Sequence, residues 1–257
     1  MRIAVCIKTV VDPQARIELD GEGRLCRQHL RLEVNEYDLY AVEEALRLAE
    51  STQGQVLVVT LGSDGAVQGL RKGLAMGADS AMHIECAPEL VDAAGTAKLL
   101  AAALRRDLPD LVLTGVESDD LGGAQVGVLL AEELDFASTT LVVGASAPEH
   151  GAMKLRRELE GGDYAAIEID LPAVLGIQSG INEPRYPSLK GIMAAKRKEL
   201  TTLTPAELGF DPLPSRRVES LGLMLPPARR RARIIEGTVD EAVAELVRIL
   251  REEEKVL

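Results

Sequence analysis

The chain has 257 residues, of which 46% are hydrophobic and 27% charged, and its formal net charge is -12 at pH 7. This composition supports one sizeable core with an appendage and does not require two domains. Nucleic acid is excluded as the main partner. Phosphate backbones are bound by clustered Lys and Arg, and 2% of aromatic residues supply no stacking platform for single strands. No apolar run approaches membrane-spanning length, so direct membrane insertion is not expected.

Five short runs rich in β-branched residues predict strands that are buried on both faces. They lie at residues 2–8, 55–62, 81–85, 110–115 and 139–144. Each run is almost continuously apolar, which is typical of parallel strands covered by helices. Because the first strand begins near the first residue, we expect no signal or transit peptide and a cytoplasmic protein.

Helical periods fill the gaps between these runs. In residues 35–50, Leu39, Val42 and Leu46 share one helical face. Asn35 stands at the N-cap position, where a side chain accepts a hydrogen bond from a backbone N–H of the first turn. Asp38 stands three residues later, where a carboxylate accepts a hydrogen bond from the backbone N–H of the N-cap residue. Further helices are predicted before Gly77, and over residues 93–106 and 124–134. Strands that alternate with helices predict an α/β fold with a doubly wound, mostly parallel, Rossmann-like sheet.

Two hairpins and a long arm depart from this alternation. The hairpins turn at residues 21–23 and at Gly161 and Gly162. From residue 196 the chain is proline-rich and without a clear period, and it ends in a helix for which Thr238 and Glu241 form a capping box. The domain's own sheet is already covered, so an extended arm ending in an amphipathic helix implies a partner chain. We therefore divide the chain into an α/β domain, 1–195, and an arm with a closing helix, 196–257.

Charge is distributed unevenly along the chain. Residues 190–233 hold ten basic and four acidic residues, although the chain as a whole is acidic. Such asymmetry usually marks a contact surface.

The segment TGVESDDLGGAQVG, residues 114–127, follows a predicted strand. Doubly wound sheets bind ligands beyond the carboxyl ends of their strands, where the strand order reverses. Asp120 precedes Gly122 and Gly123, and the helix is predicted to open at Ala124, so free backbone N–H groups would face an anion such as phosphate. A plain strand-to-helix loop is the alternative, because neither a Walker A sequence nor GxGxxG occurs.

No catalytic residue and no metal site are predicted. The sequence lacks GxSxG, HExxH and a paired Cys and His, and its three histidines are far apart. Glu43, Glu44 and residues 251–254 are interpreted as solvated helix faces. The cysteines are interpreted as small core or strand residues in a reducing compartment; they are Cys6, Cys26 and Cys86. Any chemistry must therefore come from a bound cofactor.

Four stretches resemble the β subunit of electron-transferring flavoproteins. They are NEYDLYAVEEALRL (35–48), RELEGG (157–162), LPAVLGIQSGINEPRYPSLKGIMAAKRK (171–198) and AELVRILREEEKVL (244–257). The block NEPRYPSLKGIM is the most specific of them, and the likeness covers nearly the whole chain. The resemblance implies a heterodimer with an α subunit, on which residues 196–257 pack and whose mobile domain carries a redox-active FAD at the shared interface. It also implies a second adenine nucleotide in this chain, either AMP or FAD.

The resemblance places this nucleotide at the carboxyl ends of the strands. The implied contacts are Cys6, Asn35, Asp38, Leu61, Gly115, Asp120, Gly122, Gly123, Ala124, Gln125 and Val126. They include the anion site that the glycine pair indicates independently. Housekeeping members carry further aspartates and GQ or GQT in this loop, whereas AQVG here is more similar to the Fix-type and electron-bifurcating branch. The lost side chains leave room for a longer, pyrophosphate-linked ligand, which favours FAD over AMP.

The resemblance also implies a recognition loop at residues 181–198. In it Leu189 matches an apolar anchor that enters a pocket of a partner dehydrogenase, while surrounding charges orient the encounter. Its neighbours are Pro187, Ile192 and Met193. The alternative is that Leu189 is a core residue. Glu158 matches a glutamate that holds the mobile flavin domain in place.

The implied partners are acyl-CoA-type or other flavin dehydrogenases, a quinone reductase or ferredoxin. The chain would carry electrons without bond chemistry, and a bifurcating complex would also oxidise NADH. A stand-alone adenine-nucleotide-binding regulatory domain of the universal-stress type is the alternative, although it would not need the arm and closing helix. An enzyme that cleaves ATP to pyrophosphate would require SGGxDS after the first strand, where this chain has KTVVDPQ.

Overall fold

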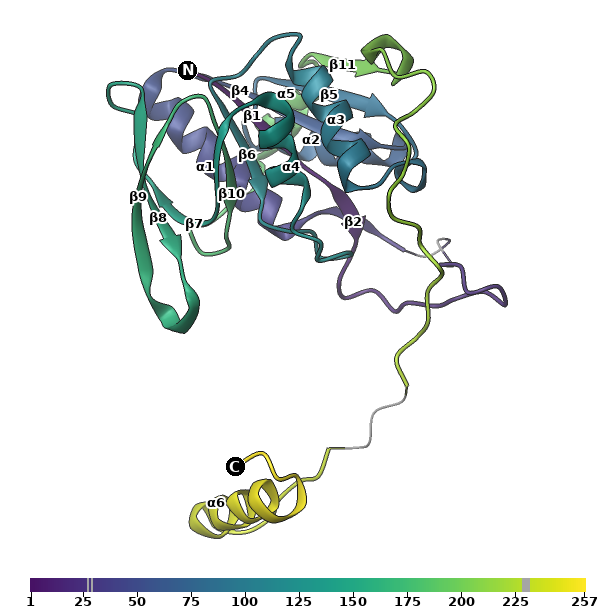
Figure 1. The fold of residues 1–257 in the computed structure, drawn as a ribbon, viewed down its shortest axis with the longest axis vertical. Coiled ribbons are helices and arrows are strands. Elements are labelled where there is room, and N and C mark those ends of the chain that lie inside the picture. Colours follow the sequence, from purple (N-terminus) through teal and green to yellow (C-terminus); the bar gives the residue numbers. More distant parts are fainter. Residues whose placement is uncertain (27, 29, 228–231) are drawn as a thin grey trace. The chain divides into compact units, whose positions relative to one another are not determined.

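The computed structural model describes residues 1–26, 28, 30–227 and 232–257. The chain forms two compact units, which we describe separately. The first comprises Met1–Glu18 with Cys26–Leu221 and contains the large sheet (Figure 1). The second comprises Leu19–Leu25 with Gly222–Leu257 and contains helix α6.

In the described part of the chain, nine strands form one sheet in the order β11-β5-β4-β1-β6-β10-β7-β8-β9, and β2 pairs with β3 separately. The strands of the large sheet are β1 (Arg2–Cys6), β4 (Gln55–Gly62), β5 (Ser80–Glu85), β6 (Leu111–Gly115), β7 (Ala137–Ala145), β8 (Ala152–Glu158), β9 (Tyr164–Asp170), β10 (Ala173–Ile177) and β11 (Leu200–Leu203). The ribbon consists of β2 (Thr9–Val11) and β3 (Leu32–Val34). The α-helices are α1 (Glu36–Thr52), α2 (Val67–Met76), α3 (Ala93–Leu104), α4 (Val126–Leu134), α5 (Leu189–Ala195) and α6 (Val239–Arg248).

The sheet is parallel from β11 through β7, and β8 and β9 continue it as an antiparallel edge. The chain proceeds from β1 to β4 and β5 on one side, then crosses to β6 on the other side of β1. The strand order therefore reverses between β1 and β6. This topology confirms the predicted α/β, doubly wound, mostly parallel sheet.

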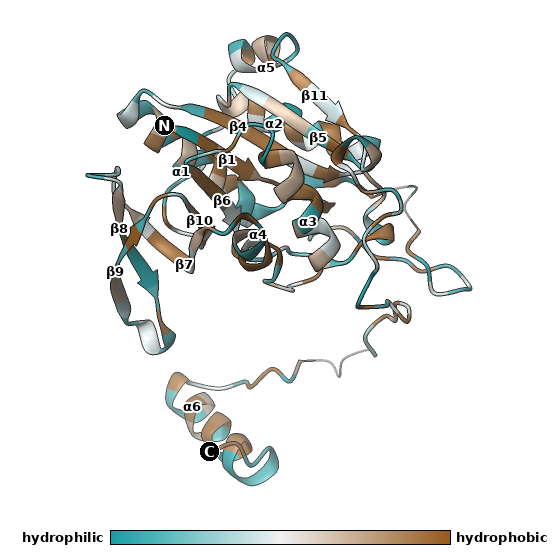
Figure 2. Cartoon of the chain, turned by 45° about the horizontal axis from the view of Figure 1, so that its top comes forward, coloured by the Kyte–Doolittle hydropathy of each residue, from teal (hydrophilic) through white to brown (hydrophobic). Residues whose placement is uncertain are grey.

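Alternate residues of β1 explain why both faces of the sheet are covered. Ile3 and Val5 pack into a core with α1 and α2, whereas Ala4 and Cys6 pack into a second core with α3 and α4. All four side chains are buried. Figure 2 shows β1 and β4 coloured mostly as hydrophobic. A strand that is apolar on both faces is stable only between two helical layers, as the continuous apolar run predicts.

The five predicted strands are present. The hairpin at Gly161 and Gly162 consists of β8 and β9, whereas the one at residues 21–23 has a single bridge between Leu19 and Leu25. Strand β10 is not among the predictions. All five residues of β10 are buried, and the strand lies between β6 and β7. Its position between two earlier strands depends on long-range pairing, which local periodicity does not report. Strand β11, the short edge partner of β5, is also absent from the predictions.

Two expectations about burial are wrong. Glu43 and Glu44 are 3% and 6% exposed, not solvated, because the segment after β10 covers this part of α1. Cys6 and Cys86 are buried as expected, but Cys26 is exposed and lies outside any strand.

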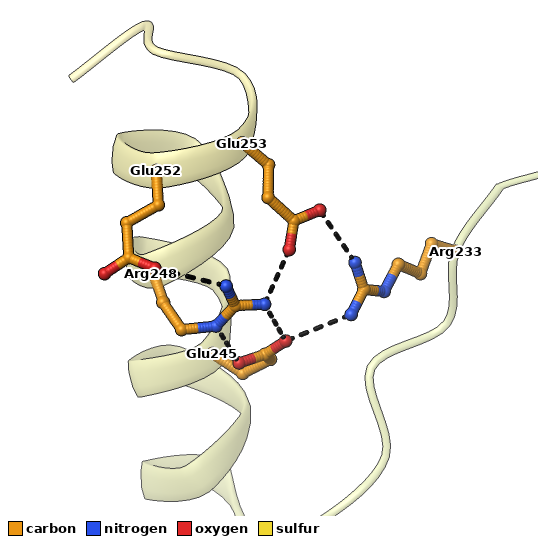
Figure 3. Close-up of polar contacts among 5 residues, drawn as sticks. All are labelled: Arg233, Glu245, Arg248, Glu252 and Glu253. Carbon is orange, nitrogen blue, oxygen red and sulfur yellow. Dashed lines mark hydrogen bonds and ion pairs between the residues drawn. The ribbon is translucent and has the colours of Figure 1, made fainter.

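The second unit contains the closing helix. Thr238 and Glu241 form the predicted capping box, with both reciprocal hydrogen bonds. Arg248 is paired with glutamates on its own helix, and Arg233 reaches two of the same glutamates from the preceding segment (Figure 3). Val239, Val243 and Leu246 are exposed. Within the described residues, no helix combines the length and apolarity needed to cross a membrane. Of the basic residues counted above, Arg229, Arg230 and Arg231 lie outside the described residues.

Candidate functional site

The reversal of strand order between β1 and β6 creates a polar site around Asp38. This residue lies in the first turn of α1 and is 5% exposed. Its carboxylate accepts a hydrogen bond from the backbone N–H of Lys8, at 2.7 Å, and another from that of Gly115, at 2.9 Å. Lys8 follows β1 and Gly115 ends β6, so Asp38 connects the carboxyl ends of two neighbouring strands. Ligands bind at this position in doubly wound sheets.

Burial raises the pKa of Asp38 to about 7, although the hydrogen bonds from Lys8 and Gly115 act in the opposite direction. Burial, with the adjacent Asp38 charge, raises the pKa of Cys6 to about 12, so this thiol stays protonated. Position 115 has no room for a side chain. A Cβ at this position would overlap Oδ1 of Asp38 and lie 2.7 Å from Cβ of Tyr37.

Asn35 does not cap α1, which corrects the prediction for its first turn. Its side chain forms no cap hydrogen bond. Instead Nδ2 donates to the carbonyl of Glu117 at 2.8 Å, and Oδ1 accepts from the N–H of Asp119 at 3.0 Å. Asp119 in return accepts from the N–H of Glu36 at 3.2 Å. The predicted hydrogen bond from Asp38 back to the start of α1 is also wrong, because its two carboxylate oxygens accept from the backbone N–H groups of Lys8 and Gly115. Both side chains connect α1 to the loop after β6.

The loop from Ser118 to Gln125 lies over this polar site. Nζ of Lys8 contacts Asp120 at 2.6 Å and Ser118 at 3.2 Å. The N–H of Gly122 donates to the carbonyl of Ser118 at 2.7 Å, and Gly122 has a φ of +57° that favours glycine. Residues 121–125 are exposed.

Helix α4 begins at Val126, two residues later than predicted, and Gln125 gives it no side-chain cap. The first N–H groups of a helix have no acceptor within the helix, so this end of α4 suits an anion.

The structure brings most of the predicted nucleotide contacts to this one place. Asn35, Asp38, Gly115 and Asp120 belong to the hydrogen-bonded set, whereas Gly122, Gly123, Ala124, Gln125 and Val126 form the exposed loop and helix start. Cys6 and Leu61, on neighbouring strands β1 and β4, pack in the core beneath them. Lys8 is absent from the predicted contacts. Its position just after the first strand, beside the reversal, is the signal that could have indicated it.

The residues present fit an anionic ligand that also carries hydroxyl groups. The start of α4 supplies positive charge, and Lys8 supplies an ammonium group that pairs with Asp120 at 2.6 Å. A Cβ at Gly123 would meet no heavy atom within 4 Å, so this glycine borders open space. Glu117 and Asp119 supply acceptors for hydroxyl groups. Burial and these two carboxylates, with Glu36, raise the pKa of Tyr37. An anion is therefore favoured at the glycine end of the loop, and neutral donors are favoured near the carboxylates.

The predicted docking residues surround the start of α5. Leu189 is 83% exposed, so it is not a core residue, and Ile192 and Met193 are exposed beside it. Pro187 is half-buried and, with Ile192, lines a groove of about 480 Å³ between α5 and α2. An apolar patch that includes a leucine exposed to this extent on a well-formed helix is typical of a contact surface.

Comparison with known proteins identifies the family. A family model described as "Electron transfer flavoprotein domain" matches residues 23–208. The chain is 34% identical to the electron transfer flavoprotein subunit beta of Methylophilus methylotrophus over 98% of both chains, and 34% identical to that of Bacillus subtilis over 100% of both. It is 39% identical to that of Mycobacterium tuberculosis H37Rv over 81% of both. The chain belongs to the electron transfer flavoprotein β-subunit family. The resemblance inferred from the four residue blocks is therefore confirmed.

One further residue, Glu158, was predicted from the family resemblance to contact the mobile flavin domain. It ends strand β8, opposite Tyr164 of β9. One carboxylate oxygen accepts a hydrogen bond from Nε2 of Gln178, just after β10, at 3.0 Å. Glu158 therefore lies at the end of the antiparallel edge, and it is not one of the residues around Asp38.

Proposed function

We propose that this chain is the β subunit of a heterodimeric electron transfer flavoprotein. It pairs with an α subunit, binds an adenine nucleotide at the polar site around Asp38, helps to hold the FAD of the α subunit and docks flavin dehydrogenases through Leu189. The observation that carries the proposal is similarity over the full chain to proteins named electron transfer flavoprotein subunit beta. This similarity favours an electron carrier over a stand-alone regulatory domain.

The polar site supports the nucleotide part of the proposal. Lys8 and the backbone N–H groups from Gly123 to Val126 would hold phosphate, and Glu117 and Asp119 would accept hydrogen bonds from ribose hydroxyls. Leu121 and Gly122 stand where housekeeping members carry further acidic residues, which favours a second FAD over AMP, and AMP is the alternative. A bound flavin supplies the redox chemistry, and the side chains of this chain bind and orient it.

The exposed apolar residues support two protein contacts. We propose that residues 196–257 pack on the α subunit, for which Val239, Val243 and Leu246 offer an apolar helix face. Glu158 would contact its mobile flavin domain. Leu189, Ile192 and Met193 would enter the surface of an acyl-CoA-type or other flavin dehydrogenase, inside a rim of basic residues.

The test is to co-express this chain with an α subunit, purify the complex and mix it with a substrate-reduced acyl-CoA dehydrogenase. The expected result is a stable heterodimer whose FAD is reduced at a rate that saturates with complex concentration. Reduction by NADH would identify the bifurcating type. A chain that stays monomeric and soluble and carries a nucleotide without any α subunit would contradict the proposal and favour a stand-alone domain.

A further inference from the structure

The segment that carries Leu189 is fixed to α1 by an ion pair in which the Glu43 carboxylate is buried and the Arg185 side chain is 36% exposed. Arg185 donates to the carboxylate of Glu43 through Nε at 2.8 Å, through Nη2 at 3.0 Å and through its backbone N–H at 3.1 Å. Its Nη1 also donates to Glu50 at 2.7 Å. One arginine therefore contacts two glutamates that are seven positions apart on α1, which fixes both its position and its orientation.

Glu43 depends on this arginine because the carboxylate is removed from water. Burial opposes its ionisation, but hydrogen bonds from Arg185 and Arg47 outweigh burial, so the pKa of Glu43 lies below its ordinary value. Three residues before Arg185, Nδ2 of Asn182 donates to Glu44 at 3.0 Å and to the carbonyl of Tyr40 at 3.1 Å. The whole stretch 182–185 is thus held on α1.

A second, independent attachment holds the other end of the segment on α2. Gly191 lies so close to the backbone of Ala75 that a Cβ would overlap the Ala75 carbonyl oxygen. Arg71 donates to the carbonyl of Ala195, at the end of α5, at 2.6 Å. Lys198 donates to the carbonyl of Leu74 at 3.2 Å, near the end of α2.

Between these attachments the chain has little freedom. Only three residues separate Arg185 from Leu189, and one of them is Pro187, which restricts its own backbone and that of Tyr186. Tyr186 and Leu189 are both highly exposed, so burial does not hold them. Their direction is set by the attachments on either side.

We propose that Arg185 and Glu43 are positioning residues that fix the direction in which the exposed Leu189 face is presented to an incoming dehydrogenase. The inference rests on the proposed docking function. If Arg185 is released, the stretch before α5 becomes mobile and must be ordered at each encounter, which weakens association. The polar site around Asp38 keeps its contacts, so electron transfer within the docked complex is unchanged.

The test uses four variants of this chain in complex with its α subunit. Arg185→Met removes the ion pair and leaves Glu43 paired with Arg47. Arg185→Lys keeps the positive charge but cannot donate two parallel hydrogen bonds to the Glu43 carboxylate. Leu189→Ala removes the docking side chain, and Arg106→Met, at an exposed arginine after α3, is the matched control. The readouts are amide hydrogen exchange of residues 186–195 and the kinetics with an acyl-CoA dehydrogenase that reduces the wild-type complex.

Arg185→Met should speed exchange of residues 186–190 about tenfold and raise KM for the complex about tenfold, with kcat and nucleotide content unchanged. Arg185→Lys should lie between Arg185→Met and wild type, and Arg106→Met should match wild type. Suppose that Leu189→Ala raises KM, but that the exchange rate or the KM of Arg185→Met equals that of wild type. The positioning role of Arg185 is then wrong, and docking through Leu189 is supported. If Leu189→Ala leaves KM unchanged, the docking part of the proposed function is wrong instead, whatever the exchange data show.

Discussion

Asp38 accepts a hydrogen bond from the backbone N–H of Gly115 at 2.9 Å, and this contact joins the start of α1 to the end of β6. The same carboxylate binds the N–H of Lys8, just after β1. One buried side chain thus holds together the strand ends between which the strand order reverses. The loop after β6 is built on this support, so the geometry of the proposed nucleotide site depends on it.

Gly115→Ala should disrupt this support. The added Cβ would overlap Oδ1 of Asp38, and backbone and carboxylate cannot both move without losing hydrogen bonds. We expect a loss of about 2–3 kcal/mol in the free energy of unfolding, measured by urea unfolding of the purified complex. Gly123→Ala is the matched control, because a Cβ there meets no atom within 4 Å. Equal unfolding midpoints for the two variants would contradict the role of Gly115.

The titration of Asp38 predicts a pH dependence of stability. Its pKa rises from 3.8 to about 7 on folding, so the folded protein holds the proton more tightly than the unfolded chain. The stabilisation is complete below pH 3.8 and is lost as the pH rises towards 7. Asp38→Asn is always neutral, but its amide group cannot accept from both N–H groups, so it should be less stable throughout.

The gap in Tm between wild type and Asp38→Asn should therefore be larger at about pH 5 than at about pH 8. Thermal unfolding of the complex at both pH values measures it. A gap that is constant with pH would show that Asp38 does not titrate in this range.

Local patterns predict the elements better than they predict side-chain partners. The apolar runs give the strands, and Thr238 and Glu241 give the cap of α6 because both partners lie within one turn. Asn35 has an equally suitable position for a cap, yet its side chain binds Glu117 and Asp119, which are more than 80 residues away. Local spacing cannot reveal a distant partner that wins this competition.

The prediction that Glu43 and Glu44 are solvated is wrong for the same physical reason. Glu43 and Glu44 look like part of a solvated face because each residue is charged and the helix is amphipathic. Their partners, Arg185 and Asn182, come from a segment that follows β10, a strand that was itself not predicted. The loop after β6, by contrast, is recognisable from neighbouring residues, because a glycine pair follows a buried strand, and its binding of a nucleotide stays a prediction.

The basic residues around Leu189 should control the rate of encounter. Lys190, Lys196 and Arg197 are exposed, so they can attract a partner at a distance. Replacing Lys196 and Arg197 by Gln should lower the association rate with a dehydrogenase about threefold at low salt, and the difference should vanish at high salt. Stopped-flow reduction of the complex at several ionic strengths measures this effect. An equal loss at every salt concentration would argue against electrostatic attraction.

The capping box should stabilise α6 locally. Thr238→Ala removes the side-chain acceptor for the N–H of Glu241 and should cost about 1 kcal/mol, whereas Thr238→Ser should be nearly neutral. Because α6 belongs to the second compact unit, the effect should be confined to it. Amide hydrogen exchange of residues 239–253 in the complex should accelerate only in the Ala variant. Equal exchange in both variants would mean that the cap does not limit opening of the helix.

We propose that the loop above Asp38 holds the phosphate of an adenine nucleotide. The most direct measurement is the amount of FAD and AMP released per heterodimer on denaturation, for wild type, Gly123→Glu and Gly123→Gln. The two substitutions add nearly the same volume to open space and differ in charge. We predict one FAD from the α subunit plus one further FAD or AMP in wild type, loss of that second nucleotide in Gly123→Glu, and its retention in Gly123→Gln. A wild-type complex without a second nucleotide, or equal nucleotide content in the two variants, would mean that this loop does not hold a phosphate.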